Sequence, residues 1–162
     1  MKKEEKLILG DIVGYLPHNI ECILSPIGRF NLDSELGTPY EATQPMKITN
    51  VIIGDKVEIE IHSEKTNWGV GLIELEEITL ILKPFSEFKK EIEGYNIDCI
   101  SKYIGGAWCD IYDGAISHIL DNEEINIKAL PLFFIEYFYE NRYDFKGLIS
   151  RGLAVDINTL KD

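Results

Sequence analysis

The sequence predicts an α+β fold, in which a small antiparallel β-sheet or partly open barrel is followed by a mainly helical C-terminal unit. Up to Pro84, apolar and polar residues mostly alternate with the period of a β-strand. After Pro84, the apolar residues mostly recur at helical spacing. The 162 residues are 45% hydrophobic, which is enough to build a core. We therefore divide the chain into residues 1–84 and 85–162, which pack together as two linked units or as one compact domain.

The first residues predict a short helix followed by a strand. The helix covers residues 6–16 and ends before Pro17, although Gly10 and Gly14 lower its helical propensity. Residues 20–24 are mostly apolar and are typical of a strand. Together they form the expected entry to the sheet.

A β-hairpin is the clearest element of the sequence. Residues 47–53 enter it and residues 56–62 leave it, and the two-residue link Gly54–Asp55 suits a primed turn. Two further strands are expected at residues 69–75 and 78–82. The second hairpin strand has an apolar face and a polar face, formed by Val57, Ile59 and Ile61 and by Glu58, Glu60 and His62.

The sequence after Pro84 predicts helices separated by glycine stops. Residues 86–93 begin with Ser86 as a capping residue and end before a glycine. Residues 98–103 form a second expected helix. Residues 114–120 are compatible with either a helix or a strand.

The C-terminal region predicts two helices and a short extended tail. The first covers residues 129–139, and the aromatic side chains on its apolar face are expected to fill the protein's own core. Tyr139 and Tyr143 fall off that face and are the expected exposed residues, available for partner contacts. The second helix covers residues 145–151, after Asp144 as its cap. Residues 153–157 are expected to be extended.

The charge pattern excludes several classes of function. The net charge is −12, divided evenly between the two predicted units, so direct nucleic-acid binding through basic residues is not expected. No apolar run reaches the roughly 20 residues that span a bilayer. The apolar stretch at residues 7–9 is too short for a signal peptide. We therefore expect a soluble, cytoplasmic protein.

Residues with catalytic potential are few. Cys109 precedes Asp110, and Asp113 and His118 are nearby in sequence, so a cysteine–histidine pair with an orienting carboxylate is conceivable, although no local signature supports it. Cys22 is expected to be a small core residue. The histidines lack metal-ligand spacing, and the glycines do not form a phosphate-binding loop. We expect no metal and no cofactor.

Three segments carry a resemblance to a known group of proteins. They are residues 6–17 (KLILGDIVGYLP), 81–92 (ILKPFSEFKKEI) and 143–158 (YDFKGLISRGLAVDIN). In this order they resemble proteins of prophages and mobile elements of Bacteroides-type bacteria, for which no activity is known. The chain departs from that pattern at His18 and Lys146, where the group commonly has aromatic residues. The resemblance implies an origin in a mobile element and a location in the cytoplasm of a bacterial host or in a virion. It assigns no catalytic residue.

Three hypotheses about function follow, each from a different class. The first is a non-enzymatic accessory or structural protein of a prophage, acting through contacts with a protein, either a second copy or a phage or host component. The alternative is an acidic decoy that mimics nucleic acid and binds a basic partner. It predicts rows of carboxylates without interspersed lysines. The third is a small cysteine-dependent hydrolase that uses Cys109 and His118.

Overall fold

The computed structural model describes residues 5–26, 44–63, 68–93, 110–122 and 125–160. In this part of the chain, six strands form one open sheet in the order β4-β3-β2-β1-β5-β6. The strands are β1 (Glu21–Leu24), β2 (Met46–Ile53), β3 (Val57–Ser63), β4 (Trp68–Glu74), β5 (Ile78–Leu82) and β6 (Ala154–Asp156). The helices are α1 (Leu9–Ile12), α3 (Phe85–Glu93), α5 (Asp110–Asp121) and α6 (Leu132–Glu140). Short 3₁₀ turns cover Leu16–His18, Leu75–Glu77, Ile127–Ala129 and Ile157–Thr159.

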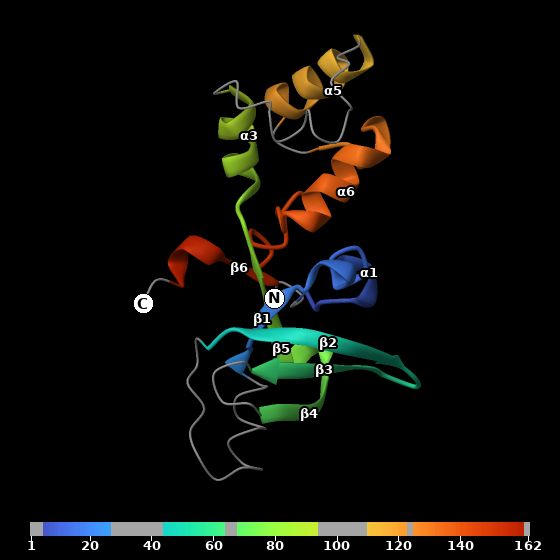
Figure 1. Ribbon diagram of the computed structural model, residues 1–162, viewed down its shortest axis with the longest axis vertical. Helices are drawn as coiled ribbons and strands as arrows, with labels where there is room; N and C mark the ends of the chain where they lie inside the picture. Colours follow the sequence, from blue (N-terminus) through green and yellow to red (C-terminus); the bar gives the residue numbers. More distant parts are fainter. Residues whose placement is uncertain (1–4, 27–43, 64–67, 94–109, 123–124, 161–162) are drawn as a thin grey trace.

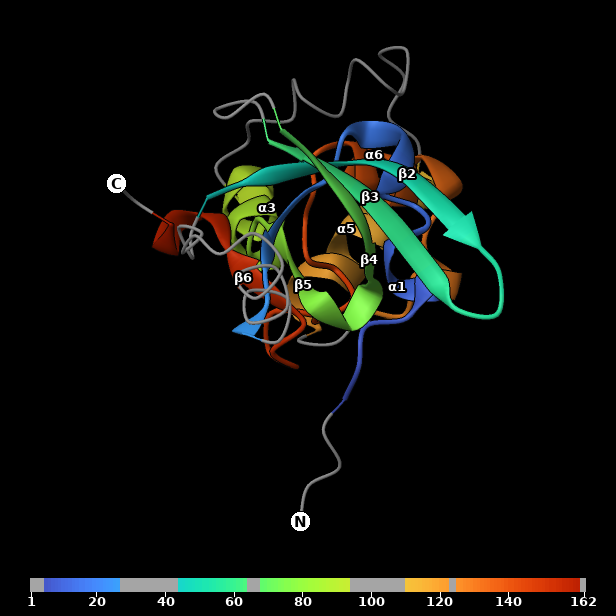
Figure 2. The same ribbon diagram turned by 90° about the horizontal axis from the view of Figure 1, so that it is seen from below.

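The α+β class is confirmed, but the order of sheet and helices matches only in part. The C-terminal strand β6 joins the sheet beside β5 and runs parallel to it, so the sheet is mixed rather than purely antiparallel. The sheet is also open, not a barrel. Figures 1 and 2 show α3, α5 and α6 gathered beyond one face of the sheet, with α1 beside them.

The hairpin of β2 and β3 forms as the alternation predicts. Ile59 and Ile61 are fully buried, whereas Glu60 on the opposite face is exposed. Ile53 pairs with Val57, so the connection has three residues rather than the expected two. A register shift lies between Ile48 and Asn50, and after it the residues of β2 no longer alternate between buried and exposed.

One continuous core joins the sheet to the helices. Buried side chains from β1, β3 and β5 belong to the same apolar cluster as those of α3, α5 and α6. The aromatic face of α6 supplies its centre, because Phe134 and Phe138 are fully buried and Tyr137 nearly so. The expectation that this face fills the protein's own core is therefore confirmed. The boundary at residue 84 stays a prediction, although the core runs across it.

Two helix predictions are wrong in extent or type. The first helix is limited to the four residues of α1 and continues, past Gly14, only as the 3₁₀ turn Leu16–His18. Residues 145–151 form consecutive turns rather than a helix. Gly147 interrupts them with φ of 68°, a left-handed conformation that a helix does not contain. Residues 114–120, which the sequence left open, lie in α5; the expected helix at residues 98–103 lies outside the described residues.

Candidate functional site

Of the three residues that the sequence suggested for catalysis, only His118 has a side chain that the structure describes. Cys109 lies outside the described residues, as does the side chain of Asp113 in α5. His118 is on α5, and its Nε2 accepts the backbone N–H of Asn126 at 3.3 Å. Its Nδ1 lies 3.2 Å from the side-chain amide nitrogen of Asn122. Both ring nitrogens therefore hold the chain that follows α5.

The two tyrosines expected to be exposed have different surroundings. Tyr143 is only 1% exposed, so the expected exposure is wrong at this position. Its hydroxyl donates to Glu91 on α3 at 2.7 Å, and its backbone bridges Lys83 after β5. Tyr139 is half-buried against Tyr15 and Phe145, with ring centroids 4.8 and 5.0 Å away. Tyr143 is buried because residues 142–144 run beside the end of β5, a long-range contact that the sequence did not indicate.

A pocket of about 760 Å³ lies between α1 and the turns after α6. We call it the α1–turn pocket. Its described lining residues come from four separate parts of the chain, and they combine apolar side chains with two carboxylates and two cations. They are Ile8, Gly10, Asp11, Phe85, Ile125, Ile127, Asp144, Phe145, Lys146, Gly147, Ser150 and Arg151.

Asp144 organises the C-terminal wall of the pocket. Its carboxylate accepts the backbone N–H of Leu148 at 2.6 Å and that of Ile149 at 2.8 Å. Sequence analysis therefore identified a capping residue correctly, although it caps turns and not a helix. Burial raises the pKa of Asp144 above its ordinary value, while the N–H donors of Ile149 and Leu148 and the charge of Arg151 act in the opposite direction.

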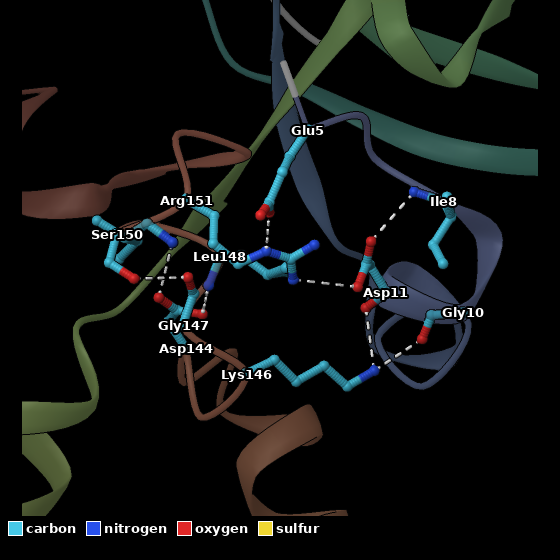
Figure 3. A network of polar contacts seen from close by, with 11 residues as sticks. Glu5, Ile8, Gly10, Asp11, Asp144, Lys146, Gly147, Leu148, Ser150 and Arg151 are labelled. Carbon is cyan, nitrogen blue, oxygen red and sulfur yellow. Dashed lines mark hydrogen bonds and ion pairs between the residues drawn. The ribbon is translucent and has the colours of Figure 1, made fainter. Parts of the chain in front are cut away.

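Lys146 and Arg151 connect this wall to the N-terminal segment (Figure 3). The ammonium of Lys146 donates to the carbonyl oxygens of Gly10 and Asp11, at 2.8 and 3.3 Å. It also lies 5.2 Å from the centre of the Tyr139 ring, within cation–π range. Arg151 donates from Nε to Glu5 at 2.6 Å, and its Nη1 lies 3.6 Å from Asp11 Oδ1.

The N-terminal wall is held by Asp11. Its Oδ2 accepts the backbone N–H of Ile8 at 3.1 Å, which caps the first turn of α1. Ile8 and Ile127 come from distant parts of the sequence, and both line the pocket while remaining 60% and 36% exposed. The pocket therefore has polar walls, fixed by internal contacts, and large apolar side chains with access to solvent.

The lining residues were not found by sequence analysis, although a signal was present. Every lining residue except Ile125 and Ile127 belongs to residues 6–17, 81–92 or 143–158, the three segments singled out in the sequence. Each segment had an adequate local explanation as a cap, a strand end or a turn. What joins them is the fold, because parallel pairing of β6 with β5 brings the C-terminal turns back to α1.

The described residues contain no group of three or more His, Cys, Asp or Glu side chains placed to hold a metal ion. In the same part of the chain, no helix has both the length and the apolar character needed to cross a bilayer. Cys22 is buried, and its burial raises the pKa of the thiol to about 12. This thiol is a core residue, as expected from the sequence.

Comparisons with known proteins give no match: no family model, no curated protein and no solved structure resembles the chain significantly.

Proposed function

We propose that the protein is a non-enzymatic accessory or structural protein of prophage type that acts by binding another protein, and that the α1–turn pocket is the contact site. The observation that carries this proposal is the pocket itself, walled by fixed polar groups and open to solvent beside Ile8 and Ile127. Exposed apolar side chains rimmed by polar groups are typical of interaction sites.

The state of the charged side chains favours binding over catalysis. Asp11, Lys146 and Arg151 hold the N-terminal segment against the C-terminal turns, and Asp144 holds the turns themselves. Groups committed to such contacts preorganise a surface, which lowers the entropy lost on association. The volume of about 760 Å³ is within the range of pockets that enclose a small ligand or a few side chains.

The distribution of carboxylates supports this proposal over the acidic decoy. Lys6 pairs with Glu76, and Lys56 pairs with Glu74 on the sheet. Arg142 pairs with Glu21 at 2.7 Å. A mimic of nucleic acid needs rows of unneutralised charge at the surface, whereas each of these three carboxylates is paired with a cation.

A peptide selection tests the contact site. A random peptide library displayed on phage is selected against the wild-type protein, and the recovered peptides are titrated against Ile127→Glu by fluorescence anisotropy. A charged side chain at the rim should weaken binding by about tenfold or more, because an unpaired carboxylate would be desolvated in the complex.

Ile53→Glu is the matched control. Ile53 is a 71% exposed isoleucine at the hairpin of β2 and β3, and it is not among the residues lining the pocket. Binding that survives Ile53→Glu but not Ile127→Glu supports the proposal. Equal binding to both variants, or selection of no peptide, contradicts it.

A further inference from the structure

The imidazole of His118 has hydrogen-bond donors beside both of its ring nitrogens. Nε2 accepts the backbone N–H of Asn126 at 3.3 Å, and Nδ1 lies 3.2 Å from the side-chain amide nitrogen of Asn122. This amide nitrogen also donates to the carbonyl oxygen of His118 at 2.8 Å. A neutral imidazole has one accepting nitrogen, whereas the cation carries a proton on both nitrogens and accepts nothing. The hydrogen bond from Asn126 therefore exists only while His118 is neutral.

This hydrogen bond holds a segment that lines the α1–turn pocket. Ile125 and Ile127, on either side of Asn126, both belong to the lining. In the described part of the chain, the other hydrogen bonds of residues 125–127 are local and join them to residues 128–130. The bond to His118 is therefore the hydrogen bond that ties this wall of the pocket to α5.

Charged groups near this contact are of both signs. Lys89 on α3 donates to the carbonyl oxygen of Asn122 at 2.6 Å, and its charge opposes a second cation nearby. Lys128, which follows the segment, has the same sign. Asp121 at the end of α5 favours a cation, and so does the C-terminal end of the helix, where His118 lies in the last turn. Two further carboxylates, Glu123 and Glu124, lie outside the described residues.

The ring of His118 is within reach of protons from the solvent, because the residue is only half-buried. Histidine is the residue type whose charge ordinarily changes between about pH 5 and 8. A proton taken up at Nε2 occupies the lone pair that accepts the N–H of Asn126, so two donors then face each other. Uptake of one proton thus converts the attachment of residues 125–127 into a repulsive contact.

We propose that His118 is a pH-sensitive contact that regulates the α1–turn pocket: the neutral imidazole holds residues 125–127 against α5, and protonation releases them. The contact itself is a property of the free protein. Its consequence, weaker binding of a partner at acidic pH, rests on the proposed function, because Ile125 and Ile127 form part of the proposed contact site.

Hydrogen exchange of backbone amides in the full chain, followed by NMR at about pH 7.5 and about pH 5.5, tests the contact without a ligand. After correction for the intrinsic effect of pH, the protection of the Asn126 amide should fall by about three- to tenfold at the lower pH, as for the loss of one hydrogen bond. The amides of β3 should keep their protection, since they are bonded to β2 and β4.

Two substitutions at His118 separate its charge from the rest of the side chain. His118→Gln is neutral and keeps an accepting oxygen, so the protection of the Asn126 amide should not depend on pH. His118→Lys is charged throughout and should show the low protection already at about pH 7.5. His62→Gln is the matched control, since His62 is a half-buried histidine on β3 in the sheet, and its replacement should leave the pH effect unchanged.

A selected peptide that contains no histidine measures the consequence at the contact site. Its binding to the wild type should be about three- to tenfold weaker at about pH 5.5 than at about pH 7.5, because Ile125 and Ile127 are no longer fixed. Binding to His118→Gln should change less. The difference between the two proteins belongs to His118, because Asp144, whose pKa is raised by burial, lines the pocket in both.

Equal protection of the Asn126 amide at both pH values, or the same loss of protection in His118→Gln, would overturn the inference. If neither variant of His118 folds, the exchange of the wild type and of His62→Gln still decides the question. A selected peptide that requires Ile127, together with exchange that does not depend on pH, would refute the pH-sensitive contact alone. The expected change in exchange without any selected peptide would support the contact and refute the proposed function.

Discussion

Asp144 is a buried carboxylate whose hydrogen-bond partners are backbone N–H groups. It is 7% exposed, and it closes the turns that form one wall of the α1–turn pocket. Replacement by asparagine keeps the size but leaves one acceptor oxygen in place of two. We expect Asp144→Asn to lower the free energy of unfolding by about 1–3 kcal/mol, as for a buried donor left unsatisfied.

The pH dependence of this effect has a defined sign. Because burial raises the pKa of Asp144 above 3.8, the folded protein binds more protons than the unfolded chain between the two pKa values. This contribution to stability is therefore complete below the unfolded pKa and is lost as the pH rises through the folded pKa. In urea unfolding at a series of pH values, the stability gap between wild type and Asp144→Asn should narrow toward neutral pH. A gap that widens with pH would contradict this assignment.

Gly14 is required by close packing and not by a left-handed backbone. A β-carbon at this position would lie 2.1 Å from Cζ of Tyr139, whose ring is held between Tyr15 and Phe145. Gly14→Ala should therefore destabilise the protein by about 1–3 kcal/mol. Gly10→Ala is the control, since its nearest neighbour would be 3.8 Å away. Equal thermal midpoints for the two variants would show that the Tyr139 ring moves freely.

At the scale of elements, α6 anchors the helical layer to the sheet. Phe138 is fully buried and contacts the rings of Phe85, Phe88 and Phe145, at 5.1, 4.8 and 5.2 Å between centroids. Phe138→Ala should lower the free energy of unfolding by about 3–5 kcal/mol. Leu132→Ala in the same helix should change it by less than about 0.5 kcal/mol, because Leu132 is 71% exposed. Chemical unfolding of both variants measures this difference. Similar losses of stability would contradict the assignment of the Phe138 face of α6 to the core.

Local sequence signals predicted the elements that depend on local properties. The alternation of apolar residues in β3 and their 3.6-residue repeat in α6 each predicted which face of the element is buried. The turns at residues 145–151 were not, because Gly147 is equally compatible with a helix end and with a left-handed turn in the middle. The burial of Tyr143 depends on its contact with the end of β5, which is remote in sequence.

The candidate site could not be predicted from local sequence patterns, because it is built by contacts between segments that are remote in sequence. Asp144 was recognised as a cap, but its role as a pocket wall depends on α1 lying opposite. Lys146 reaches Gly10 and Asp11 across more than a hundred residues of sequence. Only tertiary pairing of the C-terminal segment with β5 creates this contact, and a single sequence carries no direct record of such pairing.

In the whole molecule, the N-terminal segment lies against the turns that follow α6. The N-terminal segment that begins at Glu5 and the C-terminal turns are tied through Arg151 and Lys146, while the β2–β3 hairpin lies in the sheet layer (Figures 1 and 3). This arrangement gives the protein a preorganised pocket with an open apolar rim. We expect a partner to bind at this pocket.

Isoleucine methyl NMR of the full chain, titrated with a peptide recovered by selection, can show whether this binding occurs. Ile8, Ile125 and Ile127 line the pocket, whereas Ile52 and Ile53 belong to β2 and do not line it. We expect saturable shifts of the three pocket methyl signals and none at Ile52 and Ile53. Shifts confined to the β2 methyl groups, with the pocket signals unchanged, would contradict it.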